Sequence, residues 1–287
     1  MPSARDLQRQ INTVKNQSRV FSALQTVSSV KFRKAEARVK RARPYADNVE
    51  QMMRDVASSA SGDLPLLVGR EVNRVAVCTL TADRGLAGGF NAQVLRRTVG
   101  LRSEKDQNAL QVASGRKAVA FFRFRRVELA EVFTGFTDNP TYEKAREIGS
   151  TLTSLFEDEE ADEVYLVYNR FESALNQTPV VKRLLPVAEE GDEDKDDGAS
   201  SYMEYVPDAE TVLKRLVPRY VETMVWQALL EGAAGEHGAR MAAMKNASDN
   251  ANDLVRDLTL QMNKARQAQI TQEILEIVSG AEALSAG

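Results

Sequence analysis

A seven-residue repeat runs through the first part of the chain and limits what this part can fold into. From Leu7 onward, positions spaced alternately four and three residues apart carry mostly apolar or small side chains. The set is Leu7, Ile11, Val14, Ser18, Phe21, Gln25, Ser28, Phe32, Ala35, Val39, Ala42, Ala46, Val49, Met53 and Val56. A repeat sustained this long is typical of a helix that buries one seam against another helix. The chain is therefore expected to hold a long helix that needs a partner helix.

Two features interrupt this repeat. Ser18, Gln25 and Ser28 are polar and would loosen the seam or fit against small residues. Pro44 lacks a backbone N–H and clashes with the preceding turn, so a kink or break is expected between Arg41 and Pro44.

A second long helix is predicted near the other end of the chain. The run from Ala239 to Ser279 contains neither glycine nor proline and would form a helix about 60 Å long. Its last turns carry Ile270, Ile274, Ile277, Ala281 and Leu284 at spacings of four and three, which builds an apolar stripe that something must cover. Gly232, Gly235 and Gly238 precede this run, and a bend or a softer helix is expected there.

The middle of the chain has a different texture, with short apolar runs alternating with amphipathic segments. Strands are expected at 72–80, 110–113, 127–133, 164–169 and 180–185, and helices at 91–99, 116–122 and 142–156. Such alternation favours an α/β layer structure with a mostly parallel sheet. The acidic stretch 188–201 is expected to be a solvated connector, and helical periodicity returns from Pro207.

Convergent catalytic groups are not evident. The single histidine, His237, lies beside two glycines and is expected to be exposed on its helix, and the single cysteine, Cys78, is expected to be a buried thiol. The segment 83–89 lies where a dinucleotide fingerprint would fall, but its glycines have the wrong spacing, and no phosphate-binding loop is found. We therefore expect no catalytic site, no metal and no cofactor.

Net charge and hydropathy limit the classes of partner that the chain is expected to bind. The net charge is −3, although cations crowd the segment 31–43. That segment suits a solvated face or electrostatic docking onto a partner, and nucleic-acid binding is not expected because aromatic interleaving is poor. The first residues lack the apolar core of a secretory signal, and no uncharged stretch reaches membrane-spanning length, so only peripheral association with a membrane is expected.

Four segments, in order along the chain, resemble motifs of one family. They are Lys31–Lys34, Thr81–Asn91, Glu236–Lys245 and the terminal segment with Ile270, Thr271, Glu273, Glu276, Gly280 and Ala281. Together they resemble the gamma subunit of F-type ATP synthases over nearly the whole chain. The resemblance implies a rotor that contains no catalytic site and contacts the alpha, beta and epsilon subunits and the c-ring, at the cytoplasmic face of the bacterial plasma membrane.

The resemblance and the residue pattern together predict an α+β fold, in which a long antiparallel coiled coil of the terminal helices carries an inserted Rossmann-like α/β domain. The expected parts are a first coiled-coil helix at 1–60, the α/β domain at 70–187, the acidic loop and connector at 188–206, and a second coiled-coil helix at 207–287.

Site residues follow from the resemblance by matching position. The expected contacts with the alpha/beta ring are Arg266, Gln267, Ile270, Ile274, Ile277, Val278 and Arg84. Those with the epsilon subunit and c-ring are Arg41, Arg43, Tyr45 and Tyr205, and the basic stretch of the first helix is Lys31, Arg33 and Lys34. The chain departs from the family pattern at Phe21, Ser22 and Val30, and the plastid-type insert with its cysteine pair is absent, so thiol control is not expected.

Two other interpretations stay open. One is an α/β enzyme with a helical dimerisation arm, which would bind a nucleotide tightly on its own. The other is a basic coiled-coil scaffold for nucleic acid, whose binding would depend on salt and on the cations between Lys31 and Arg43.

Overall fold

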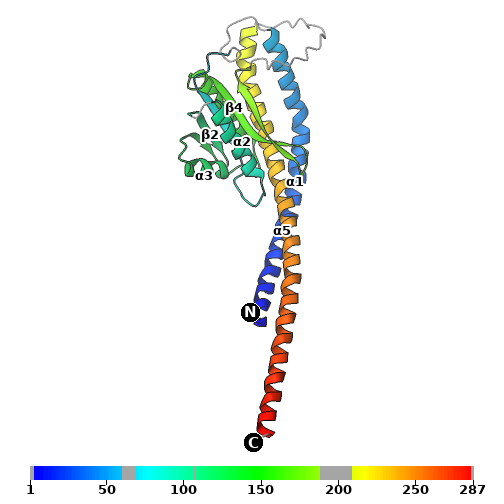
Figure 1. Ribbon diagram of the computed structural model, residues 1–287. Coiled ribbons are helices and arrows are strands. Elements are labelled where there is room, and N and C mark those ends of the chain that lie inside the picture. Colours follow the sequence, from blue (N-terminus) through cyan, green and yellow to red (C-terminus); the bar gives the residue numbers. More distant parts are fainter. Residues whose placement is uncertain (1–2, 60–68, 106–107, 188–208, 286–287) are drawn as a thin grey trace. The chain divides into compact units, whose positions relative to one another are not determined.

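The described residues form two long helices, three shorter helices and a five-stranded mixed sheet (Figure 1). The computed structural model describes residues 3–59, 69–105, 108–187 and 209–285. Helix α1 spans Ala4–Ser59 and helix α5 spans Ala209–Ser285. The residues pack in two compact units, one formed by 1–27 with 241–287 and the other by 28–240.

The sheet lies within 28–240. Its strands are β1 (Val75–Leu80), β2 (Leu110–Ser114), β3 (Leu129–Phe133), β4 (Glu163–Phe171) and β5 (Gln177–Leu185). They are ordered β3-β2-β1-β4-β5; β5 alone is antiparallel to its neighbour β4, whereas the other pairs are parallel. The predicted mostly parallel sheet is confirmed, with each strand within a few residues of its expected range.

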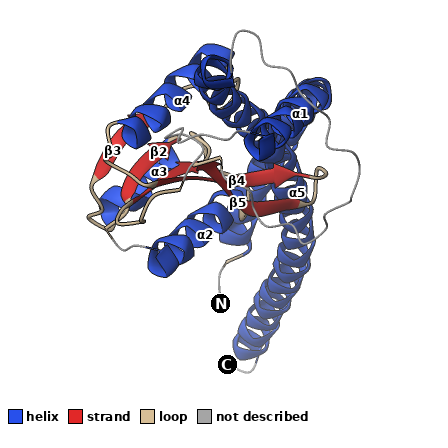
Figure 2. Cartoon of the chain, turned by 90° about the horizontal axis from the view of Figure 1, so that it is seen from above, coloured by secondary structure: helices blue, strands red, loops and turns tan. Residues whose placement is uncertain are grey.

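Helices cover both faces of this sheet (Figure 2). The helices α2 (Phe90–Lys105) and α3 (Arg116–Phe124) lie on one face. The helix α4 (Tyr142–Glu157) lies on the other, together with parts of α1 and α5. This double cover explains why β1 is buried at every position and reads as a continuous apolar run.

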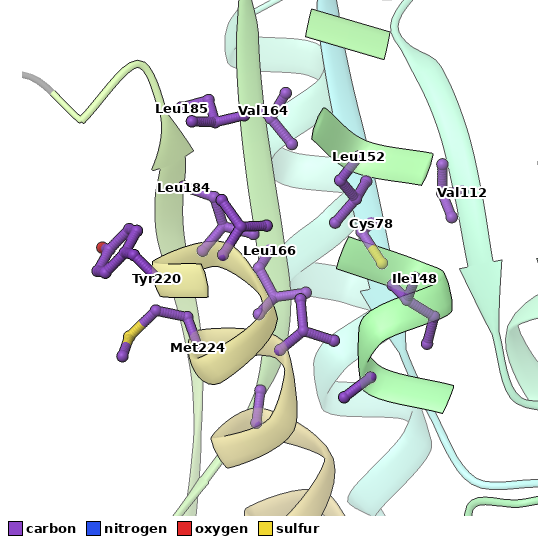
Figure 3. Packing of buried hydrophobic residues seen from close by; sticks show 14 of the residues in the cluster. Cys78, Val112, Ile148, Leu152, Val164, Leu166, Leu184, Leu185, Tyr220 and Met224 are labelled. Atoms are coloured by element: carbon purple, nitrogen blue, oxygen red, sulfur yellow. The ribbon is translucent and has the colours of Figure 1, made fainter. Parts of the chain in front are cut away.

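The largest apolar cluster joins strands of the sheet with α1, α4 and α5 in one core (Figure 3). Cys78 on β1 and Leu166 on β4 face Ile148 and Leu152 of α4, while Tyr220 and Met224 enter from α5. Burial raises the pKa of the Cys78 thiol to about 12, so this thiol stays protonated and unreactive, as expected for a structural cysteine.

The repeat along α1 matches its burial. Leu7, Ile11, Ser18, Ser28, Val39, Ala46, Val49 and Met53 are buried, and the other repeat positions up to Met53 are partly buried. Within the unit of 1–27 and 241–287, the Ser18 hydroxyl donates to Asn252 Oδ1 at 2.9 Å and lies 3.3 Å from the Ser248 hydroxyl. The polar seam position is therefore satisfied by hydrogen bonds across the helix pair.

Helix α1 does not break at Pro44. It continues through that residue to Ser59, so the break is excluded, and the alternative of a kink between Arg41 and Pro44 stays a prediction. Packing on both sides explains the tolerance, because Val39 and Ala46 are buried and hold the helix across the missing hydrogen bond.

Two glycines of α5 permit close contact with the elements around the sheet, within the unit of 28–240. A Cβ added at Gly235 would lie 2.9 Å from Phe90 Cε2, and one added at Gly238 would lie 2.9 Å from the Ala174 carbonyl oxygen. Helix α5 is continuous through this stretch. These two glycines therefore serve close approach between elements, whereas a Cβ at Gly232 would meet nothing within 4 Å.

Candidate functional site

The turn at 81–89, which follows β1 and leads into α2, is fixed from inside the sheet unit by Asp83. One carboxylate oxygen of Asp83 accepts from the Arg116 N–H at 3.0 Å, and the other accepts from the Gly135 and Thr137 N–H groups at 2.8 and 3.1 Å. Burial acts to raise the pKa of Asp83, but these backbone donors outweigh it and hold the pKa below its ordinary value. The aspartate is thus a charged anchor between three loops.

Helix α5 holds the same turn from outside the sheet. Arg240 donates through Nε and Nη2 to the Gly85 carbonyl oxygen, both at 3.1 Å, and its Nη2 also donates to Glu236 Oε1 at 2.5 Å. The Glu236 side chain is buried, and burial raises its pKa although Arg240 acts in the opposite direction. Arg84 at the tip of the turn is exposed, as its expected role as a contact requires.

Sequence reasoning missed this Glu236–Arg240 pair as an anchor. Its partner Gly85 is 155 residues away, so no local pattern reveals the contact. A signal was present, since Glu236 and Arg240 carry opposite charges and lie four residues apart on one helix face.

His237 is buried, with 2% of its surface exposed, which corrects the expectation of an exposed residue. Its neighbours explain the burial, because the ring lies against Asp138 of the loop that follows β3 and against the Arg240 side chain one turn along the helix. The imidazole Nε2 lies 3.3 Å from the Asp138 carbonyl oxygen and 3.5 Å from its carboxylate. Burial lowers the pKa of His237, so the ring is neutral at physiological pH.

Asp138 also joins α1 to this cluster. The Lys31 ammonium donates to Asp138 Oδ2 at 2.5 Å. Burial acts to raise the pKa of Asp138, but the bond from Lys31 and the nearby positive charges lower it overall. Lys31 therefore serves as an internal tie between the first helix and the loop at 138–140.

The other expected cations on α1 divide into two groups. Arg43 donates to Glu231 Oε1 at 2.9 Å and to the Phe171 carbonyl at 3.0 Å, so its guanidinium is held internally. Arg33, Lys34 and Arg41 are exposed, and so is the neighbouring Tyr45, which was expected at the same contact. Tyr205 lies outside the described residues.

The crevice at the carboxyl ends of the parallel strands is filled. In doubly wound sheets a ligand binds where the strand order reverses, which here falls between β1 and β4. Helix α5 covers this region and leaves a cavity of about 20 Å³, enough for about one water. The cavity is lined by Leu80, Thr81, Ala82, Phe90, Thr137, Ala228, Leu229, Gly232, Ala233 and Glu236.

Between residues 3 and 285, outside the three undescribed gaps, no group of three or more metal-binding side chains comes together. Within the same described part, none of the helices has the length and apolar character needed to cross a bilayer.

The last turns of α5 expose the apolar stripe. Ile270, Ile274, Ile277 and Val278 are exposed, with Ile277 at 72%. Arg266 and Gln267 lie just before the stripe and are exposed as well. Along this part of the helix, the Gln272 side-chain amide donates a hydrogen bond to Glu276 Oε1 at 3.0 Å. A side chain with such exposure is available to a partner.

Solved structures with this fold are assemblies of rotary ATP synthases. A chain of the central stalk and c-ring of the Tetrahymena thermophila mitochondrial ATP synthase superposes with a TM-score of 0.62, at 20% identity, over 80% of this chain and 99% of that one. A chain of the Euglena gracilis mitochondrial ATP synthase superposes with a TM-score of 0.73, at 18% identity, over 99% and 95%. The fold is therefore one found in such assemblies.

The family follows from sequence comparison. The family model described as ATP synthase matches residues 3–284. The ATP synthase gamma chain of Rubrobacter xylanophilus is 67% identical over 290 residues, covering the full length of both chains. That of Moorella thermoacetica is 45% identical over 285 residues, covering 99% of this chain and all of the relative. The chain belongs to the ATP synthase gamma chain family.

Proposed function

We propose that this chain is the central-stalk rotor of a proton-translocating F-type ATP synthase and transmits torque between the c-ring and the alpha/beta ring. The observation that carries this proposal is a helix of 77 residues whose last described turns present an exposed apolar stripe, in a member of the gamma chain family. A helix that serves only its own fold would not leave such a stripe bare.

The shaft of this rotor would be an antiparallel coiled coil of α1 and α5. Within 28–240, Val39 packs with Leu230 and Ala234, whereas the later residue Met53 shares a cluster with Val217. Rising numbers on α1 thus meet falling numbers on α5. The parts would be the helices at 1–60 and 207–287, a Rossmann-like α/β domain at 70–187 and a connector at 188–206.

The upper bearing would be the exposed end of α5. Ile270, Ile274, Ile277 and Val278 would turn inside an apolar sleeve of the alpha and beta subunits, because apolar contacts have no directional bonds that fix one angle. Arg266 and Gln267 would make the polar contacts that transfer torque, and Arg84 would add a cation from the turn at 81–89.

The opposite end of the rotor would rest on the epsilon subunit and the c-ring. Exposed Arg41 and Tyr45 are available for this contact, while the internal bonds of Arg43 assign it a supporting role. Arg33 and Lys34 are free to steer a partner electrostatically, whereas Lys31 is bound to Asp138. The chain would be held at the cytoplasmic face of the bacterial plasma membrane, peripherally, through the c-ring.

The chain would contribute asymmetry and would leave the chemistry to the beta subunits. Its sheet crevice is filled by α5, which counts against a nucleotide-binding enzyme with a helical arm. As an asymmetric shaft turns, each beta subunit in turn would meet a different face of it, so rotation would become a cyclic change in nucleotide affinity.

Reconstitution tests this proposal. The purified chain alone should hydrolyse no ATP, and adding it to alpha and beta subunits that lack a gamma chain should give a complex with ATPase activity. A complex that forms without this chain and gains nothing from it would overturn the rotor assignment. Tight nucleotide binding by the chain alone would favour the enzyme alternative.

A further inference from the structure

Leu86, at the tip of the turn at 81–89, combines exposure with an unfavourable backbone conformation. Its side chain is 61% exposed and its φ is 62°, in the left-handed region. A bulky L-residue rarely adopts this region, where glycine or asparagine is the usual choice. Such a conformation persists only when the surrounding structure enforces it.

The contact that enforces it is visible. The peptide group between Gly85 and Leu86 turns as one plane, and its orientation sets the φ of Leu86. Arg240 donates two hydrogen bonds to the carbonyl oxygen of this peptide, from Nε and from Nη2, both at 3.1 Å. Two donors on one oxygen fix the peptide plane more tightly than one would.

Arg240 is itself held in place. Its side chain is largely buried, its Nη2 donates to the buried Glu236 carboxylate, and its Nη1 lies 3.4 Å from His237 Nδ1. The guanidinium therefore has little freedom to follow the peptide if the peptide turns.

Both ends of the turn are fixed as well. Asp83 binds the N–H groups described above at one end, and Ala87 and Phe90 pack with Ala239 of α5 at the other. The turn cannot relax by shifting as a whole, so the strain stays at Leu86 and the leucine is presented beside Arg84.

We propose that Arg240 and Glu236 are positioning residues that hold Leu86 outward as an apolar contact for a loop of the surrounding alpha/beta ring. The loop would offer an apolar side chain for Leu86 and a carboxylate for Arg84, since both residues are exposed and lie two positions apart in the same turn. This inference rests on the proposed rotor function and adds a residue pair that prepares one contact.

The first experiment uses the isolated full-length chain and asks whether the pair holds the strained backbone. Glu236→Gln and Arg240→Met are introduced together, so that no buried charge is left unpaired, with and without Leu86→Gly. We expect amide hydrogen exchange at residues 84–88 to quicken on the order of ten- to a hundredfold in the Leu86 background, as for loss of a charge-assisted hydrogen bond. The increase should be markedly smaller with Leu86→Gly, since glycine adopts this φ unaided.

An equal increase in both backgrounds would overturn the positioning role. Arg240→Lys is the conservative variant and keeps the charge. Because it offers a compact ammonium in place of a planar fork, it should restore slow exchange only in part.

The second experiment uses the assembled complex and asks whether Leu86 makes a contact. Leu86→Ala keeps the backbone but removes the side chain, and ATP-driven proton pumping relative to ATP hydrolysis should fall about two- to tenfold, as for loss of a small apolar contact. The control is Leu175→Ala, which truncates another exposed leucine, at 78% exposure, and should leave pumping unchanged.

Equal pumping by the two variants would overturn the contact. A failure of the rotor assignment would look different, because the unmodified chain would then restore no activity at all. The exchange experiment on the isolated chain would still stand or fall by itself.

Discussion

Replacing single glycines of α5 with alanine should change the stability of the chain in opposite directions, depending on which atoms lie near the new Cβ. Gly235→Ala should destabilise the chain by about 1–3 kcal/mol, because the new Cβ would meet Phe90 at 2.9 Å and Gln177 at 3.1 Å. Gly232→Ala should stabilise it by up to about 1 kcal/mol, since nothing lies within 4 Å and alanine favours the helix. Urea unfolding measures both, and stabilisation by Gly235→Ala would contradict the packing account.

The buried imidazole should make stability depend on pH near neutrality. The pKa of His237 is lowered on folding by burial, against the opposing effect of Asp138 and with help from the charges of Arg240 and Lys31. The unfolded state therefore takes up a proton more readily as pH falls through about 6.5. The free energy of unfolding should decrease below that pH, by at most about 1.4 kcal/mol per pH unit from this residue.

The control for this pH dependence is His237→Gln, because His237 is the chain's single histidine. Glu236 has a raised pKa and contributes with the opposite sign, so the measured quantity is the difference between wild type and variant in urea unfolding at several pH values. A difference that is independent of pH between about 5.5 and 7.5 would show that the imidazole titrates normally.

Individual elements are tied together by a few buried carboxylates, of which Glu231 on α5 is the clearest. It accepts from Arg43 of α1 at 2.9 Å and from the Phe171 N–H of β4 at 3.0 Å. Glu231→Ala should cost about 3–5 kcal/mol in unfolding free energy, because it leaves a cation and a buried donor without their partner.

The exposed pair of Asp253 and Arg256 serves as the comparison for Glu231. Its members are 68% and 79% exposed, so Asp253→Ala should change the unfolding free energy by less than about 1 kcal/mol. Equal costs at Glu231 and Asp253 would mean that the buried tie contributes no more than a surface pair.

The end of α5 should act in coupling and not in folding. Replacing both Arg266 and Gln267 with alanine should leave urea unfolding unchanged, because both side chains are exposed. ATP synthesis by the assembled complex should fall about tenfold or more, as for loss of one charge-assisted contact. Unchanged synthesis would remove the pair from the mechanism.

Elements were more predictable from the sequence than the contacts between them. The repeat of α1 and the apolar runs of the strands are local patterns, and both appear in the structure as burial. The Lys31–Asp138 pair joins residues 107 apart, and His237 is buried against the same Asp138, 99 residues earlier in the chain. No pattern along one helix contains that information, so the polar cluster became visible only in three dimensions.

At the scale of the whole molecule, the family and the structure support a chain built for mechanical work. Two helices of 56 and 77 residues contribute length, and α5 lines the small cavity of about 20 Å³ at the carboxyl end of β1. The end of α5 exposes the apolar side chains of Ile270, Ile274, Ile277 and Val278, which are available to a partner. These features agree with a rotor that lets other subunits carry the chemistry.

The rotor assignment is tested most directly by observing whether this chain rotates inside an anchored alpha/beta ring. Phe124 is 87% exposed, so Phe124→Cys gives an accessible label site, while the native Cys78 is buried and unreactive. With the beta subunits fixed to a surface and a bead on residue 124, the account predicts one-way turning on addition of ATP, with a pause for each beta subunit. Sustained ATP hydrolysis by the anchored complex while the bead stays still would contradict it.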